Sequence, residues 1–145
     1  MAKFVIDANV AIKWVLPEIY SDRALSLLDN DHDELLVPDF FFSEITNILW
    51  KRTQRGELTL EAADKKLSEI KQVDFAVFDS LDLVSQALAT AVQVKQAVYD
   101  CVYLTLAIEH CCQMVTADER FINALRQGSS IDCVVWLGAV GEGGG

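Results

Sequence analysis

Four acidic residues stand at positions from which they could act together on one ligand. Asp7 closes a short apolar segment near the N-terminus, Asp118 follows another apolar segment by two residues, and Asp100 opens a long apolar helix. Glu44 lies inside a further expected helix, on the shoulder of its apolar stripe. Taken singly, each aspartate is explained by helix capping, in which the carboxylate accepts backbone N–H groups, and Glu44 by exposure to solvent.

The case for chemistry rests on the combination. At the shared edge of a parallel sheet, the four side chains would face the same place. Like charges at close range raise one another's pKa or bind cations, and carboxylate oxygens suit Mg²⁺ or Mn²⁺. A cation held in this way activates water and neutralises the charge that develops on a phosphodiester, as in nucleases. The sequence contains no better catalytic set, because His32 and His110 have no metal or triad spacing and no phosphate-binding glycine loop is present.

The elements that must position these acids alternate along the chain. Short apolar segments predict strands, and apolar positions at helical spacing predict helices. The expected strands are 3–7, 34–37, 75–79, 113–116 and 133–137, and the expected helices are 8–15, 22–30, 39–55, 59–72, 81–95, one from about 99, and 118–127. Ser21, Thr59 and Ser80 are expected to cap helices, and Gly56 to end one. This alternation indicates an α/β sandwich on a mainly parallel sheet.

Length and composition favour one domain in the cytoplasm. The 145 residues suffice for a single domain over 1–140, and the glycine-rich residues 141–145 are expected to form a flexible tail. No apolar stretch is long enough to cross a membrane, and no signal-peptide core is present. The net charge of −10 argues against a broad positive nucleic-acid-binding face. That objection weakens if the acids gather in one pocket and are neutralised by divalent cations.

The cysteines offer little chemistry. Cys101, Cys111, Cys112 and Cys133 have no zinc-ligand spacing, so buried free thiols are expected. The adjacent Cys111 and Cys112 leave a redox pair as the less favoured alternative in a reducing cytosol.

Four segments carry a resemblance to a known family. They are VIDANVAIKWVLPE (5–18), LLVPDFFFSEITNILWKRTQRGEL (35–58), VYDCVYLTLA (98–107) and VTADERF (115–121). In this order and spacing they resemble a PIN domain of the VapC toxin type, the ribonuclease half of bacterial toxin–antitoxin pairs. The resemblance covers nearly the whole chain.

The resemblance implies a fold and a site. The fold is a PIN-like sandwich whose parallel sheet has five strands flanked by helices. The site is an acidic quartet that binds Mg²⁺ or Mn²⁺, whose bound water attacks an RNA phosphodiester. Carried across residue by residue, the quartet is Asp7, Glu44, Asp100 and Asp118. The family's metal is bound chiefly by the first and third acids, here Asp7 and Asp100, and Asn9 and Thr116 are placed to orient a carboxylate or a water.

Partners follow from the same resemblance. It implies an RNA substrate cut in a single-stranded part, a homodimer, and a cognate antitoxin that lies over the site and places a basic side chain among the carboxylates. Lys51, Arg52 and Arg55 would help to hold the RNA backbone, although cations in a last helical turn also complement the helix dipole.

Two other functions remain open at this stage. One is a non-catalytic PIN-like binding module that regulates an operon with its partner. The other is a receiver-type phospho-acceptor domain, which has adjacent acids after its first strand and a lysine after its last. Here Ala8 and Asn9 follow Asp7, and the last strand ends in Trp136, so the receiver pattern is matched poorly.

Overall fold

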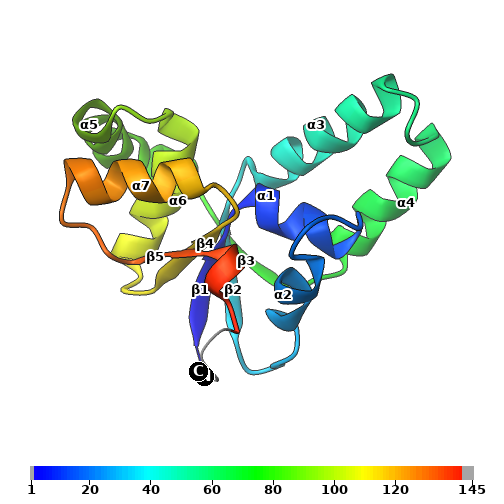
Figure 1. The fold of residues 1–145 in the computed structure, drawn as a ribbon, viewed down its shortest axis with the longest axis horizontal. Helices are drawn as coiled ribbons and strands as arrows, with labels where there is room; N and C mark the ends of the chain where they lie inside the picture. Colours follow the sequence, from blue (N-terminus) through cyan, green and yellow to red (C-terminus); the bar gives the residue numbers. More distant parts are fainter. Residues whose placement is uncertain (1, 142–145) are drawn as a thin grey trace.

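A parallel sheet of five strands forms the centre of the computed structural model, which describes residues 2–141 (Figure 1). The strands follow the spatial order β3-β2-β1-β4-β5, and every neighbouring pair is parallel. They are β1 (Lys3–Ile6), β2 (Glu34–Pro38), β3 (Phe75–Phe78), β4 (Gln113–Thr116) and β5 (Val134–Trp136). All carboxyl ends therefore lie at one edge, with β1 in the middle. The predicted fold class is confirmed, and the strand order differs from the 2-1-3-4-5 order of receiver-type sheets.

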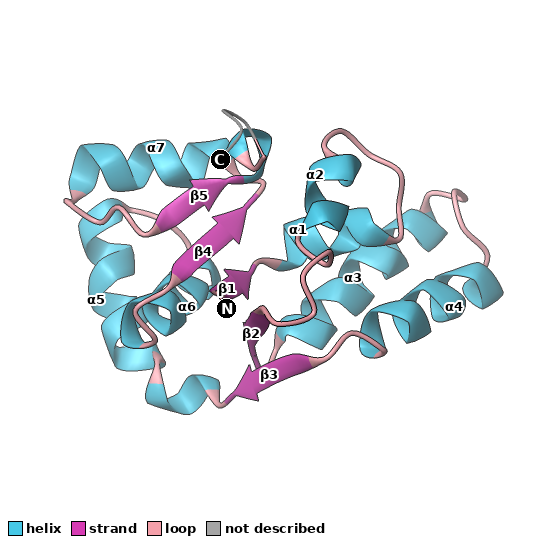
Figure 2. Ribbon diagram, turned by 90° about the horizontal axis from the view of Figure 1, so that it is seen from below, coloured by secondary structure: helices cyan, strands magenta, loops and turns pink. Residues whose placement is uncertain are grey.

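Helices cover both faces of this sheet. Figure 2 shows α5, α6 and α7 on one side and α1 to α4 on the other. The helices are α1 (Ala8–Ala11), α2 (Ser21–Ser26), α3 (Phe41–Gln54), α4 (Leu60–Lys71), α5 (Val84–Val94), α6 (Val98–Glu109) and α7 (Glu119–Gly128). Short 3₁₀ turns, η1 (Ile12–Trp14), η2 (Ser80–Asp82) and η3 (Leu137–Ala139), complete the described elements.

Helix α6 is the most deeply buried helix of the described residues. Its residues from Cys101 to Ala107 are all buried, because it packs on β1, β2 and β4 with one side and on α5 with the other. A helix that is apolar all round suits such a position. Val5 and Ile6 of β1 have no exposed surface, so the middle strand and α6 form the centre of the core. The first turn of α6 is thereby held rigidly beside the carboxyl end of β1.

The boundaries of several elements differ from those expected. The predicted helix 8–15 divides into α1 and η1, and the predicted helix 81–95 begins only at Val84, after η2. Thr59 caps α4 as expected, with its hydroxyl accepting from the Ala62 N–H at 3.1 Å, and Gly56 follows α3 at φ +76°.

Two of the predicted caps are wrong. The residue before α2 is Tyr20, in the left-handed region at φ 66°, and Ser21 is already helical. The Ser21 hydroxyl instead accepts from the Glu18 N–H at 2.9 Å. Asp79, rather than Ser80, caps η2 by accepting from the Leu81 N–H at 2.9 Å. Asp79 has the extended backbone that is typical of a cap, whereas Tyr20 is left-handed and makes no side-chain hydrogen bond to the helix.

The cysteines are free, as expected, but only Cys101 is buried. Cys112 and Cys133 are half-buried and Cys111 is exposed, so the expectation of four buried thiols is wrong. Within the described residues no helix is long and apolar enough to span a membrane. The tail expected to be flexible lies, apart from Gly141, outside the described residues.

A glycine next to the last strand tests the packing. A Cβ atom at Gly138 would lie 2.4 Å from the ring of Trp136, and that ring packs edge-on against Tyr20. We expect Gly138→Ala to lower the free energy of unfolding by about 1–3 kcal/mol, because overpacking forces a rigid ring to move. Urea denaturation measures the change. Gly128→Ala is the control, since its Cβ would meet other atoms only at 3.4 Å or more. Equal destabilisation by the two variants would contradict this account.

Candidate active site

Asp7 lies at the carboxyl end of the middle strand and is only 6% exposed. Its backbone N–H donates to the Val115 carbonyl at 3.2 Å, which continues the pairing of β1 with β4. Its carboxylate caps α1 by accepting from the Asn9 N–H at 3.4 Å, and it also accepts from the Thr116 hydroxyl at 3.0 Å. The capping interpretation is thus correct, but capping does not by itself require a buried carboxylate.

Asn9 and Thr116 join the ends of β1 and β4. The Asn9 amide donates to Thr116 Oγ1 at 3.3 Å, and the Asn9 side-chain oxygen accepts from the Ala117 N–H at 3.0 Å. Thr116 Oγ1 also accepts from the Asp118 N–H at 3.1 Å. These hydrogen bonds hold the Asp7 carboxylate in one orientation, as expected of residues that orient a carboxylate.

The other three acids approach Asp7 from three helices. Glu44 lies in the first turn of α3, is half-buried, and accepts a hydrogen bond of 2.5 Å from the Tyr103 hydroxyl. Asp100 lies in the first turn of α6 and is also half-buried. Asp118 caps α7 by accepting from the N–H groups of Arg120 and Phe121 at 3.1 and 3.3 Å.

The acids interact electrostatically. Burial, the largest cause, and the negative charges of Asp100 and Glu44 together raise the pKa of Asp7 to about 7, while the hydrogen bonds from the Thr116 hydroxyl and the Asn9 N–H oppose the shift. Burial also raises the pKa of Glu44, and the negative charge of Asp100 adds to that shift. The pKa of Asp100 is raised in the same way by burial and by the negative charge of Asp118. The structure therefore brings Asp7, Glu44 and Asp100 within electrostatic reach of one another, and it brings Asp118 within reach of Asp100.

The donor set suits a hard divalent cation. Nearby carboxylates with raised pKa values gain from a positive charge, and oxygen ligands favour Mg²⁺ or Mn²⁺. Across residues 2–141, no three His, Cys, Asp or Glu side chains are arranged to hold an ion among themselves. Mg²⁺ is commonly bound through one or two carboxylates while it keeps several waters.

Comparison with known proteins decides the family. The profile of the PIN domain matches residues 4–125, which include all four acids. The chain belongs to the PIN domain family.

Relatives of this PIN domain include VapC proteins, which confirms the resemblance read from the sequence. It is 29% identical over 120 residues to Ribonuclease VapC3 of Pyrobaculum aerophilum, covering 81% of this chain and 91% of the relative. A similar fold is found in VapC20 of Mycobacterium tuberculosis, a toxin that cleaves the sarcin–ricin loop. The TM-score is 0.65 at 15% identity, and the match covers 83% of this chain and 94% of VapC20. A toxin–antitoxin complex from Klebsiella pneumoniae also has a similar fold, with a TM-score of 0.61 and 14% identity. The match covers 94% of this chain and 98% of that chain.

Tyr103 is a member of the site that sequence reasoning missed. It is fully buried on α6, and burial together with the charges of Asp7 and Glu44 raises its pKa, so the phenol stays protonated and donates. The available signal was its spacing, because Asp100 and Tyr103 are three residues apart and share a helix face. An apolar helix made Tyr103 look like an ordinary core residue of the PIN domain.

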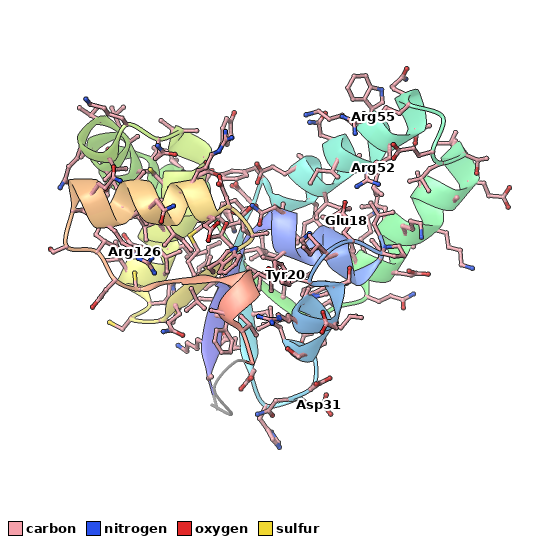
Figure 3. All side chains as sticks on the ribbon, in the orientation of Figure 1. Glu18, Tyr20, Asp31, Arg52, Arg55 and Arg126 are labelled. Carbon is pink, nitrogen blue, oxygen red and sulfur yellow. The ribbon has the colours of Figure 1, made fainter. Side chains whose placement is uncertain are left out.

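The basic residues on α3 of the PIN domain are not equivalent. Figure 3 shows Arg52 and Arg55 on α3 and Glu18 in the neighbouring segment. Arg52 forms an ion pair with Glu18 and a second one with Glu57 at 3.2 Å. Arg52 therefore joins α3 to the segment after η1, whereas Lys51 and Arg55 are exposed.

The raised pKa of Asp7 predicts how the free energy of unfolding changes with pH when a chelator removes divalent cations. Between about pH 4 and 7 the folded PIN domain keeps a proton that the unfolded chain has lost, so stability falls as the pH rises through this window. Asp7→Asn removes this penalty. We expect the variant to gain stability over the parent by up to about 4 kcal/mol between pH 4 and 8, measured by urea denaturation.

Asp31→Asn controls for the change in net charge, because Asp31 is exposed in the loop before β2. Its stability should follow the parent at every pH. If the free energy of unfolding changed with pH in the same way for Asp7→Asn and for the parent, the Asp7 carboxyl would be ionised at no cost in the folded protein.

Proposed function

We propose that this PIN domain, residues 1–140, is a divalent-cation-dependent endoribonuclease and the toxin of a toxin–antitoxin pair. The observation that carries the proposal is the buried Asp7 carboxylate, which is oriented by two hydrogen bonds and acted on by the negative charges of Asp100 and Glu44. The relatives named as a ribonuclease and as an RNA-loop-cleaving toxin support the substrate class.

The acids divide the work according to their surroundings. Asp7 and Asp100 would hold the Mg²⁺ or Mn²⁺ ion, since they lie at the end of β1 and in the first turn of the rigid α6. When bound, such an ion supplies an acidified water and neutralises charge on the phosphodiester. Glu44, whose pKa is raised chiefly by burial, would accept a proton, and Asp118 would position water at the edge of the site.

RNA needs positive groups near an acidic site. Lys51 and Arg55 are exposed on α3, the helix that also carries Glu44, so they are available to contact phosphates. Arg52 is held by Glu18 and Glu57 and is better suited to fixing α3. An extended single-stranded segment of a folded RNA is the substrate that we expect.

Ribonuclease activity is tested with a mixed bacterial RNA pool in Mg²⁺, in Mn²⁺ and in chelator. We expect cleavage that depends on the cation and falls at least about a hundredfold in Asp7→Asn and in Asp100→Asn, because each variant removes a ligand charge. Asp31→Asn is the matched control and should keep full activity. Cleavage is followed on denaturing gels.

A second measurement separates the two main functions. Binding of the cation to the folded state should raise the melting temperature of the parent but not of Asp7→Asn. Cation binding without cleavage of any RNA would favour the non-catalytic binding module that regulates an operon. Cleavage that persists in chelator and in both variants would overturn the proposal.

A cognate antitoxin is the expected inhibitor of this toxin. The Klebsiella pneumoniae neighbour was solved as a toxin–antitoxin complex, which supports such a partner. An acidic site in a protein of net charge −10 would attract a basic side chain from the antitoxin. Because its substrate is cellular RNA, we place the toxin in the cytoplasm.

We propose further that two copies associate through α5. The helix carries no charged residue from Val84 to Val94, and Leu88 and Val92 on it are 57% and 72% exposed. An uncharged apolar face is where two strongly acidic chains can approach with the least repulsion. The family resemblance implies a homodimer, which supports the association of two copies but does not locate the interface.

The homodimer is tested by Leu88→Arg combined with Val92→Arg. We expect the double variant to sediment as a monomer at concentrations at which the parent is a dimer, because four buried charges would oppose the interface. Leu60→Arg is the control, since Leu60 is 79% exposed on α4. A double variant that remains dimeric would place the interface elsewhere, and a monomeric parent would remove the homodimer.

A further inference from the structure

Tyr103 contacts the candidate site from within the core. Its side chain has no exposed surface, and its hydroxyl donates to Glu44 Oε1 at 2.5 Å. Asp100 lies three residues earlier on the same helix, so one face of α6 carries both an acid of the site and the hydroxyl that holds another. The hydrogen bond thereby joins α6 to α3 across the site.

The ring of Tyr103 holds the same part of α3. It packs edge-on against Phe40, with ring centroids 5.5 Å apart, and Phe40 is the residue that precedes α3. The Phe40 carbonyl in turn accepts from the Glu44 N–H at 3.0 Å. The ring therefore packs against the start of the helical turn whose carboxylate the hydroxyl contacts.

The burial of Tyr103 makes its position well defined. A fully buried aromatic side chain has few alternative rotamers, because the surrounding core is closely packed. Glu44, in contrast, is half-buried on a long and flexible side chain. Without a fixed donor the Glu44 carboxylate would sample several orientations, and holding it in one reduces the entropy lost when a ligand binds.

We propose that Tyr103 is a positioning residue that fixes Oε1 of Glu44 and leaves the other carboxylate oxygen to serve a divalent cation or its water. This role rests on the proposed function of the site. Tyr103 touches neither substrate nor cation, and it acts only through Glu44. It is the hydroxyl, rather than the ring, that carries the role.

The test compares Tyr103→Phe with Tyr99→Phe. Tyr99 lies on the same helix and also packs edge-on against Phe40, at 5.2 Å, but it is 63% exposed. Each variant keeps the ring and loses one hydroxyl. We expect Tyr103→Phe to weaken the affinity for Mn²⁺ about tenfold, measured by titrating cation-free protein and detecting free Mn²⁺ by electron paramagnetic resonance. Tyr99→Phe should bind Mn²⁺ as the parent does.

A double-mutant cycle separates positioning from a merely structural role. If Tyr103 acts through Glu44, Tyr103→Phe should have no further effect on Mn²⁺ affinity in a Glu44→Gln background, although it still lowers the melting temperature. The RNA cleavage rate should fall through kcat with KM little changed, because the variant leaves the RNA-contacting surface intact. Glu44→Asp is a second variant, since the shorter side chain draws the carboxylate away from the hydroxyl. It should weaken Mn²⁺ binding in the same way even if Tyr103→Phe folds poorly.

The outcomes distinguish this proposal from the proposed function. A parent that binds Mn²⁺ and cleaves RNA, with Tyr103→Phe and Glu44→Asp binding Mn²⁺ equally well, overturns the role of Tyr103 alone. A loss of Mn²⁺ affinity that is the same in the Glu44→Gln background also overturns it, because the hydroxyl then acts through another group. A parent that neither binds Mn²⁺ nor cleaves RNA removes the ribonuclease proposal together with this one.

Discussion

A carboxylate buried at the end of the middle strand is the constraint on which the rest of the structure depends. Taking a charged group out of water is costly unless it is hydrogen-bonded, neutralised or paired with a cation. Around Asp7 the fold supplies two hydrogen-bond donors and no positive side chain among the groups that shift its pKa. The negative charge of the Asp7 carboxylate is thus only partly compensated, and this suits the site to a positively charged ligand.

The surrounding strands and helices hold further acids near Asp7 and so keep its negative charge only partly compensated. The strand order puts β4 directly beside β1, so Thr116 and Asp118 arrive at the same edge as Asp7. Helix α6, which is buried from Cys101 to Ala107, holds Asp100 close by, while the ion pairs of Arg52 tie α3 to the segment after η1. Each acid therefore comes from a different segment, and packing away from the site determines how near the acids come.

Much of this arrangement could be predicted from the sequence, because apolar periodicity and the polar residues that end each strand are local signals. The five strands and the parallel sheet follow from them, whereas the four acids are assigned from their combination and from the resemblance to the PIN domain. Local signals failed at Ser80, where the preceding Asp79 has the extended backbone and forms the cap, and at Ser21, which is already helical behind a left-handed Tyr20. They failed again at Tyr103, because its hydrogen bond to Glu44 joins residues 59 positions apart. A contact of that kind depends on how α3 and α6 pack and leaves no periodic pattern.

The hydroxyl of Thr116 has one hydrogen to give and two lone pairs to offer. It gives the hydrogen to Asp7 and accepts from both Asn9 and the backbone of Asp118, so its bonding capacity is fully used. This fixes the direction of every hydrogen bond around it, because none of the three can be reversed without breaking another. The hydroxyl thus joins the end of β1 and the start of α1 to the residue that precedes α7. A methyl group of the same size would remove all three hydrogen bonds at once, while the volume of the core stayed the same.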